Sequence, residues 1–268
     1  MRHLTPLLAL IPALSIGCTT LGPTPGTTGL SARPIARGGA EVQAGVMPGH
    51  YLSSAVVEAP AAAGIPQLSA VVEVGQWVDA PGLVVGARAF GQDGDAPIEP
   101  VVGYRRELGA DGQAAVAGFA YGTRARADDN GASYTATRVG GELSADVRVT
   151  ARSRWLEPHL FGGLNVTYLD ARGTYCTDAA MRWGHDCAAP GDPPAPSMTA
   201  TIDGAFVAGN VGAAAEFLRN RRGWFRGGRL AATAAAGVMP RVEGGQRTGG
   251  EAYAAVGLSL SLAIGDAE

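Results

Sequence analysis

The sequence predicts an all-β protein, a single antiparallel up-and-down transmembrane β-barrel of about ten strands. Three observations predict this fold. Apolar residues alternate with polar or small ones along many segments, short and long connections between these segments alternate, and an export signal precedes them all. A count of eight or twelve strands would also fit the pattern, because such barrels normally have an even number.

The clearest alternation is in the segment 251–264, which reads EAYAAVGLSLSLAI. Leu258, Leu260 and Leu262 fall on one face of an extended strand, whereas Ser259 and Ser261 fall on the other, because successive side chains point to opposite faces. The apolar face contacts either a protein core or lipid. In the second case the polar face lines the interior of a barrel.

Nine further segments show strand-like alternation, and the composition agrees with a β-protein. Hydrophobic residues make up 46% of the chain but aromatic residues only 6%, and there are 40 glycines, which argues against a densely packed helical protein. The ten expected strands are 40–47, 67–78, 83–90, 98–108, 113–124, 133–149, 155–169, 201–217, 226–239 and 251–264.

The connections between these segments alternate in length. Short ones such as 79–82 and 109–112 are followed by long ones such as 125–132 and 170–200. Outer-membrane barrels have this arrangement, with short turns in the periplasm and longer loops outside the cell. An even number of strands also returns both termini to the periplasmic side.

The polar faces of the expected strands carry charges of both signs, interleaved with glycines. Arginine and glutamate pair across a narrow polar interior, and glycine leaves room for them. The polar faces also include Glu41, Asn210 and Glu216. We predict a network in the lumen formed by Glu73, Arg88, Arg105, Arg138, Glu142, Asp146, Arg148, Glu157, His159 and Arg229.

Aromatic residues cluster near the ends of the expected strands. Transmembrane barrels carry girdles of aromatic side chains at both membrane interfaces. Core aromatics are the alternative explanation. The residues expected in the girdles are Tyr104, Tyr121, Trp155, Tyr168, Phe217, Trp224 and Phe225.

The N-terminus has the order of an export signal. Arg2 and His3 precede the apolar run 4–16, which is too short to span a bilayer. The sequence 14–18, LSIGC, resembles the lipobox of bacterial lipoproteins, which implies lipidation of Cys18 and sorting to the outer membrane. We therefore expect a signal peptide over 1–17, a lipid-anchored flexible linker over 18–38, rich in Thr, Pro and Gly, and a barrel domain over 39–265. An ordinary cleavable signal is the alternative.

Two further cysteines, Cys176 and Cys187, lie in the long connection 170–200. An exported protein meets an oxidising compartment, so we expect them to form a disulfide that closes a short loop. A metal site formed by both cysteines and His185 is the weaker alternative, because it offers only three ligands and no Cys-x-x-Cys pair.

Over most of residues 39–264 the chain resembles small bacterial outer-membrane β-barrel proteins. The fragments EPHLFGGLNVTYLDA, GAFVAGNVGAAAEF and AVGLSLSLAI are similar to the strands of such proteins. The resemblance implies a location in the bacterial outer membrane, with the N-terminus on the periplasmic side and the lipid bilayer as the main partner.

No motif assigns a chemistry to the chain. Residues 50–54, HYLSS, place a histidine near two serines without a nucleophile elbow, and Glu157 and His159 share a face without a specific signature. No phosphate loop, dinucleotide fingerprint or EF-hand is present. We expect no enzyme activity, no cofactor and no metal site, and the net charge of −3 gives no support to a nucleic-acid partner.

Three functions remain open. The first is a monomeric, non-enzymatic barrel that displays loops for envelope structure, adhesion or partner binding, above all through the loop 170–200. The second is a small porin-like channel. The third is a soluble β-barrel or sandwich lipoprotein that is tethered to the outer membrane by lipid alone, with its apolar faces inside.

Overall fold

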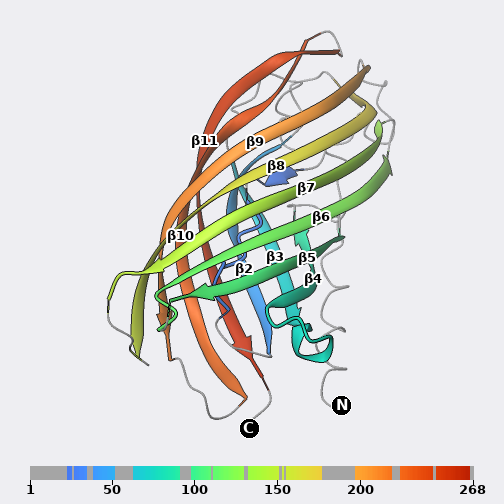
Figure 1. Ribbon diagram of the computed structural model, residues 1–268. Coiled ribbons are helices and arrows are strands. Elements are labelled where there is room, and N and C mark those ends of the chain that lie inside the picture. Colours follow the sequence, from blue (N-terminus) through green and yellow to red (C-terminus); the bar gives the residue numbers. More distant parts are fainter. Residues whose placement is uncertain are drawn as a thin grey trace.

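The computed structural model is a sheet that closes on itself as a barrel (Figure 1). Among the described residues, no helix is long and apolar enough to cross a membrane. The structure describes residues 23–25, 27–34, 39–51, 63–90, 98–109, 111–129, 132–150, 153, 155–176, 197–218, 224–243 and 246–265.

Ten strands form the barrel wall, and each pairs antiparallel with its neighbours along the chain. The wall closes because β2 pairs with both β3 and β11. Two further elements are not part of the ten-strand wall: a short strand, β1 (Pro23–Pro25), and one helical turn, η2 (Gly75–Trp77). The wall strands are β2 (Ala40–Tyr51), β3 (Ala63–Glu73), β4 (Leu83–Phe90), β5 (Ile98–Leu108), β6 (Ala114–Asp129), β7 (Ala132–Arg148), β8 (Leu156–Cys176), β9 (Ser197–Phe217), β10 (Phe225–Glu243) and β11 (Gln246–Ile264).

The closed ten-strand antiparallel barrel confirms the fold class that the sequence predicts. The expected strands and the observed ones agree best beside the short connections, with one exception. The strand expected over 67–78 ends at Glu73, because residues 75–77 form the helical turn η2. At the long connections, β8 and β9 extend into the predicted loop 170–200, since they continue to Cys176 and begin at Ser197. Backbone pairing continues there because each added hydrogen bond joins an N–H group of one strand to a carbonyl group of its neighbour.

One short connection shows why the strands reverse where they do. Residues 109–112 join β5 to β6, and Gly109 and Gly112 have φ angles of 80° and 58°. The Gly112 amide donates a hydrogen bond of 3.1 Å to the Gly109 carbonyl. Residues with a Cβ rarely adopt these positive φ values, so glycine makes this tight turn accessible.

The outer face of β11 is apolar and exposed, and its inner face is buried. Val256 and Leu258 are 75% and 62% exposed, whereas Ser259 and Ala263 are 5% and 0% exposed. The predicted alternation is therefore confirmed, with the apolar face pointing away from the protein. A soluble barrel or sandwich has the opposite arrangement, so this third alternative is wrong.

The apolar outer surface has the height of a bilayer. On β8 the outward residues from Leu156 to Tyr168 are apolar or glycine, and on β9 the same is true from Ala205 to Phe217. Thirteen residues, at about 3.3 Å each and a tilt near 40°, span about 30 Å. Above this band β8 turns the polar side chains of Asp170 and Arg172 outward.

Exposed tryptophans mark the end of the barrel with the short connections. Trp77, Trp155 and Trp224 are 65%, 66% and 73% exposed, and each lies in or beside a short connection. Trp155 and Trp224 were expected in a girdle. Tyr121 was also expected there, but this prediction is wrong, because its side chain is buried in the lumen.

The N-terminal stretch passes through the inside of the barrel. Strand β1 pairs with residues 49–51, at the end of β2 that leads to a long connection. Residues 27–34, here called the lumen segment, then run back along the lumen, and Thr28 and Arg33 are buried. This placement differs from the flexible linker expected over 18–38. Cys18 and residues 1–17 lie outside the described residues.

Candidate functional site

The residues predicted to line the lumen point inward from six strands of the wall. Glu73 is half-buried and accepts a hydrogen bond from the Gly82 amide, 3.0 Å away, in the β3–β4 connection. Arg105 pairs with Glu41 at 3.0 Å. The remaining predicted residues are buried and divide among three groups at different heights: Arg88, Arg138, Glu142, Asp146, Arg148, Glu157, His159 and Arg229.

The first group is two arginines that share one carboxylate. Arg138 contacts both oxygens of Glu99, with Nε 2.9 Å from Oε1 and Nη2 2.8 Å from Oε2. Arg88 donates to Oε2 of the same carboxylate through its Nε. We call Arg88, Glu99 and Arg138 the arginine group. It contains one more positive than negative charge.

Aromatic rings enclose the arginine group. The guanidinium of Arg88 lies 4.4 Å from the centre of the Tyr121 ring, and that of Arg138 lies 4.1 Å from the centre of the Phe90 ring. The negative face of an aromatic ring attracts a cation, most strongly where water is excluded. The rings therefore compensate part of the surplus charge.

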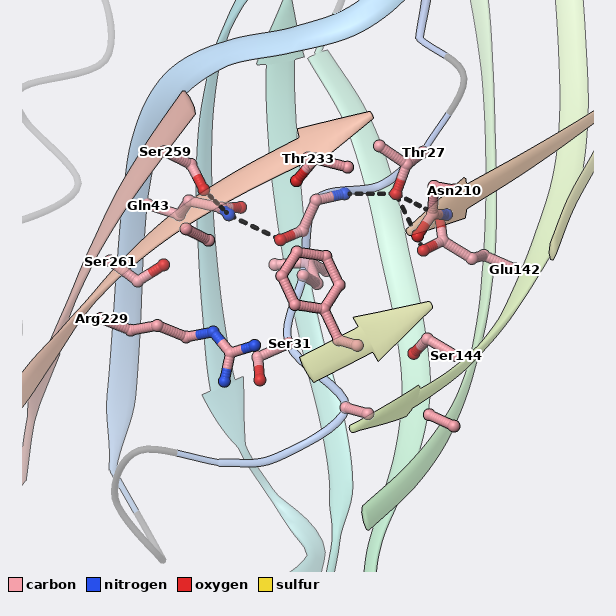
Figure 2. A pocket seen from close by; sticks show the side chains of 16 residues that line it. Thr27, Ser31, Gln43, Glu142, Ser144, Asn210, Arg229, Thr233, Ser259 and Ser261 are labelled. Atoms are coloured by element: carbon pink, nitrogen blue, oxygen red, sulfur yellow. Dashed lines mark hydrogen bonds between the residues drawn. The ribbon is translucent and has the colours of Figure 1, made fainter. Parts of the chain in front are cut away.

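The second group holds the lumen segment in place. One oxygen of Glu142 accepts a hydrogen bond of 2.9 Å from the Thr27 hydroxyl (Figure 2). Its other oxygen accepts a hydrogen bond from the Thr28 amide. Other wall side chains bind the segment's carbonyls. Gln43 and Gln67 donate to Gly29 and Thr28, both at 2.6 Å, and Arg88 donates to Thr27 at 3.2 Å.

The third group, here called the histidine cluster, contains Asp146, Glu157, His159, Glu216 and Arg229. The Nδ1 of His159 lies 2.8 Å from Oδ1 of Asp146, whose Oδ2 accepts a hydrogen bond of 2.7 Å from Arg229. Arg229 also donates to Oε1 of Glu216 at 3.1 Å. Glu157 and Glu216 are directly opposite each other on β8 and β9.

Two more arginines border the histidine cluster. Arg33 of the lumen segment lies 3.4 Å from Asp146 and 3.5 Å from Glu107. Arg148 lies 4.0 Å from Glu157, whose other oxygen accepts a hydrogen bond of 2.7 Å from the Ser153 amide. The cluster is thus adjacent to the short connections, at the periplasmic end of the predicted topology.

Little open space remains between these groups. The cavity drawn in Figure 2 lies between the lumen segment and β7, β9, β10 and β11, and about 20 Å³ of it is open to the centre of a water molecule. Such a volume holds about one water molecule. In the described residues, the lumen is therefore filled by protein at this level.

Five residues of these groups were not predicted as part of the lumen network. Glu99 was not assigned to the lumen network, although it has the same parity on β5 as the inward-facing Val101. Glu216 was placed on a polar face but not in the network. Arg33 and the two threonines of the lumen segment lie in a stretch with no periodicity, so no pattern indicated that they are inside.

The cysteine predictions fall at the edge of the described residues. Cys176 is the last residue of β8 and is paired in register with Ser197. Cys187 and His185 lie outside the described residues. The disulfide between Cys176 and Cys187 therefore stays a prediction, as does the lipidation of Cys18.

No protein-family model matches the chain, and no curated protein matches it. Two solved structures that do match are outer-membrane barrels in their architecture. The crystal structure of Ail, the attachment invasion locus protein of Yersinia pestis, has 12% identity and a TM-score of 0.30, covering 86% of this chain and 98% of that one. The N-terminal β-barrel domain of Pseudomonas aeruginosa OprF has 10% identity and a TM-score of 0.27, covering 85% and 98%.

At such TM-scores neither likeness adds to the argument. The chain is a transmembrane β-barrel of the outer-membrane type because its wall closes without a free edge and its outer face is apolar, over about 30 Å on β8 and β9.

Proposed function

We propose that this protein is a non-enzymatic, non-conducting barrel of the bacterial outer membrane that presents its long loops outside the cell for envelope structure, adhesion or partner binding. The observation that carries the proposal is the occupied lumen. The lumen segment is bound by side chains from β2, β3, β4 and β7, and charged groups lie above and below it. Ions would have to displace these contacts in order to pass.

The buried position of the histidine cluster supports the non-enzymatic part of the proposal. Glu157 and His159, the acidic residue and the histidine that share a face of β8, are both 1% exposed. A general acid or base must come within hydrogen-bond reach of its substrate. The exposed parts of β8 and β9 beyond the apolar band are better placed to meet a partner.

Recordings in planar lipid bilayers test whether the barrel conducts. We expect the wild-type protein to give no steady conductance. Deletion of residues 23–34 empties the lumen of its segment, so this variant should conduct. Arg172→Ala changes only an exposed side chain above the apolar band and should remain silent. Steady conductance of the wild-type protein would instead favour the porin-like channel.

Cysteine labelling in intact cells tests the proposed orientation. In a background of Cys176→Ser and Cys187→Ser, a membrane-impermeant maleimide should label Arg172→Cys directly. It should label Trp224→Cys only after the outer membrane is permeabilised, because Trp224 is exposed at the opposite end of the barrel. The reverse pattern would contradict the orientation.

The short length of chain between Cys18 and β1 limits where a lipid on Cys18 can insert. Four residues lie between Cys18 and Pro23, and an extended chain spans about 17 Å over these five Cα–Cα steps. While β1 stays paired at the long-loop end of β2, a lipid on Cys18 cannot reach the periplasmic leaflet. Mass spectrometry of the N-terminal peptide tests the proposed lipidation. Mass spectrometry of the fragment that contains Cys176 and Cys187 tests the proposed disulfide. Protease treatment of intact cells tests on which side the N-terminus lies.

A further inference from the structure

The three ligand-type atoms at the centre of the histidine cluster face one another. Nε2 of His159 lies 3.8 Å from Oε2 of Glu157 and 3.7 Å from Oε2 of Glu216. All three atoms lie within 4.8 Å of one another, and all three residues are buried. They come from adjacent strands, since Glu157 and His159 are on β8 and Glu216 is opposite them on β9.

The imidazole is held so that Nε2 points at these two carboxylates. A carboxylate accepts hydrogen bonds, so Nδ1 carries a proton and donates it to Asp146 at 2.8 Å. Within the part of the chain that the structure describes, Nε2 has no hydrogen-bond partner, although the side chain is fully buried. A buried polar atom without a partner requires an explanation, because burial alone costs free energy.

A proton on Nε2 does not explain the distances. A charged N–H group beside a carboxylate makes a hydrogen bond of about 2.7–2.9 Å. Both distances here are nearly 1 Å longer than that. They are close to the separation of about 3.4 Å between two ligands of a tetrahedral zinc ion, whose bonds to nitrogen and oxygen are each about 2.0–2.2 Å long.

The surrounding charges are also consistent with a bound cation. Glu157 and Glu216 are directly opposite each other on β8 and β9, and each turns its Oε2 toward the same imidazole nitrogen. Two carboxylates directly opposite each other on neighbouring strands repel unless a cation lies between them.

We propose that Glu157, His159 and Glu216 bind one divalent transition-metal ion of the zinc class, and that Asp146 positions the imidazole for it. One imidazole nitrogen and two carboxylate oxygens suit zinc or manganese, whereas calcium and magnesium prefer oxygen ligands alone. A carboxylate on the far nitrogen of a metal-binding histidine is the usual supporting arrangement. The ion would join β8 to β9 inside the lumen, near the short connections. This site is independent of the proposed display function.

The test uses the full barrel, folded in detergent and freed of metal with a chelator. Zn²⁺ binding is measured by competition with a chromogenic chelator, and Co²⁺ binding by its visible absorption. We expect one ion per chain. Glu157→Gln and Glu216→Gln keep the side-chain volume but remove a charged ligand, so each should weaken binding by about 100-fold or more, as should His159→Gln. Asp146→Asn keeps all three ligands and should weaken binding by about 10–100-fold.

Two controls make the result specific. His185→Ala removes the histidine of the alternative site with Cys176 and Cys187, and it should leave the affinity unchanged. Heat-modifiable gel mobility shows for each variant whether the barrel has folded. The proposal is overturned if the wild-type protein binds no Zn²⁺, if binding survives in both glutamine variants, or if it is lost in His185→Ala. It is also overturned if NMR of the metal-free protein with Zn²⁺ added still shows a proton on Nε2.

Discussion

The arginine group and the histidine cluster are two buried ionic centres with opposite charge balance. In the arginine group, Arg88 and Arg138 share the single carboxylate of Glu99, and the surplus positive charge lies against aromatic rings. In the histidine cluster, three carboxylates surround one imidazole, and its Nε2, which has no hydrogen-bond partner among the described residues, faces two of them. The comparison teaches that the surplus charge of the first centre lies against the protein's own aromatic rings, whereas the second turns three ligand-type atoms toward one another and has the composition of a site for a cation.

The largest expected effect is on the arginine group. Glu99→Ala leaves two guanidinium groups buried beside each other without the carboxylate that they share, so it should lower the free energy of unfolding by about 3–5 kcal/mol. The measurement is urea unfolding of the barrel from lipid vesicles, followed by tryptophan fluorescence. Glu99→Gln keeps the volume and one acceptor oxygen and should cost less.

The matched control for Glu99→Ala is an ion pair outside the lumen. Arg172 and Asp170 lie 3.3 Å apart on the exposed part of β8, with side chains 72% and 39% exposed. Exposed pairs contribute about 1 kcal/mol or less, so Asp170→Asn should hardly change the unfolding midpoint. Equal losses in Glu99→Ala and Asp170→Asn would show that the arginine group is not buried as described.

The second effect is on the histidine cluster and depends on metal. At a free Zn²⁺ concentration of 100 times Kd, binding to the folded state alone stabilises it by about 2.7 kcal/mol. We expect this gain in a Cys176→Ser, Cys187→Ser background, which removes thiols that would bind zinc in the unfolded chain. Glu157→Gln should show no gain. Glu99→Ala should retain it, because the two centres share no residue.

The third effect concerns the lumen segment between the two centres. Glu142→Gln removes the charge from the acceptor of the Thr27 hydroxyl and the Thr28 amide. Hydrogen bonds to a charged group contribute about 1.5–3 kcal/mol, so the Thr28 amide should exchange with solvent about 10–100 times faster. Ser144 lines the same cavity without a hydrogen-bond partner, and Ser144→Ala should leave this exchange rate unchanged.

The parts of the fold that touch lipid could be predicted from the sequence. Lipid on one side and a polar lumen on the other impose a period of two, which is why the faces of β7, β8 and β11 follow from the sequence alone. Above the bilayer the outer face no longer has to be apolar, and Asp170 and Arg172 break the pattern. The strand ends at the long connections were therefore placed too early.

The candidate site was only partly predictable, for two physical reasons. Tyr121 was assigned to a girdle from its distance to a strand end, although its parity with Ala117 and Phe119 on β6 indicates the inner face. The lumen segment is bound largely through its backbone, by Gln43 and Gln67 among others, and backbone contacts leave no pattern in the sequence. Pairing across the lumen, which joins Asp146 to Arg229, depends on closure and cannot be derived from any one strand.

The smallest expected effect is at Tyr121, where two substitutions distinguish the contribution of the hydroxyl from that of the ring. The hydroxyl lies 2.8 Å from Asn165 Oδ1 and 2.6 Å from Thr167 Oγ1, and those two residues also bond to each other at 2.9 Å. Tyr121→Phe leaves them paired and should cost about 1 kcal/mol in urea unfolding. Tyr121→Leu also removes the ring beneath Arg88 and should cost about 2 kcal/mol more, the contribution of a desolvated cation–π contact. If the two variants unfold alike, the aromatic rings do not compensate the surplus charge, and the contrast between the two centres is lost.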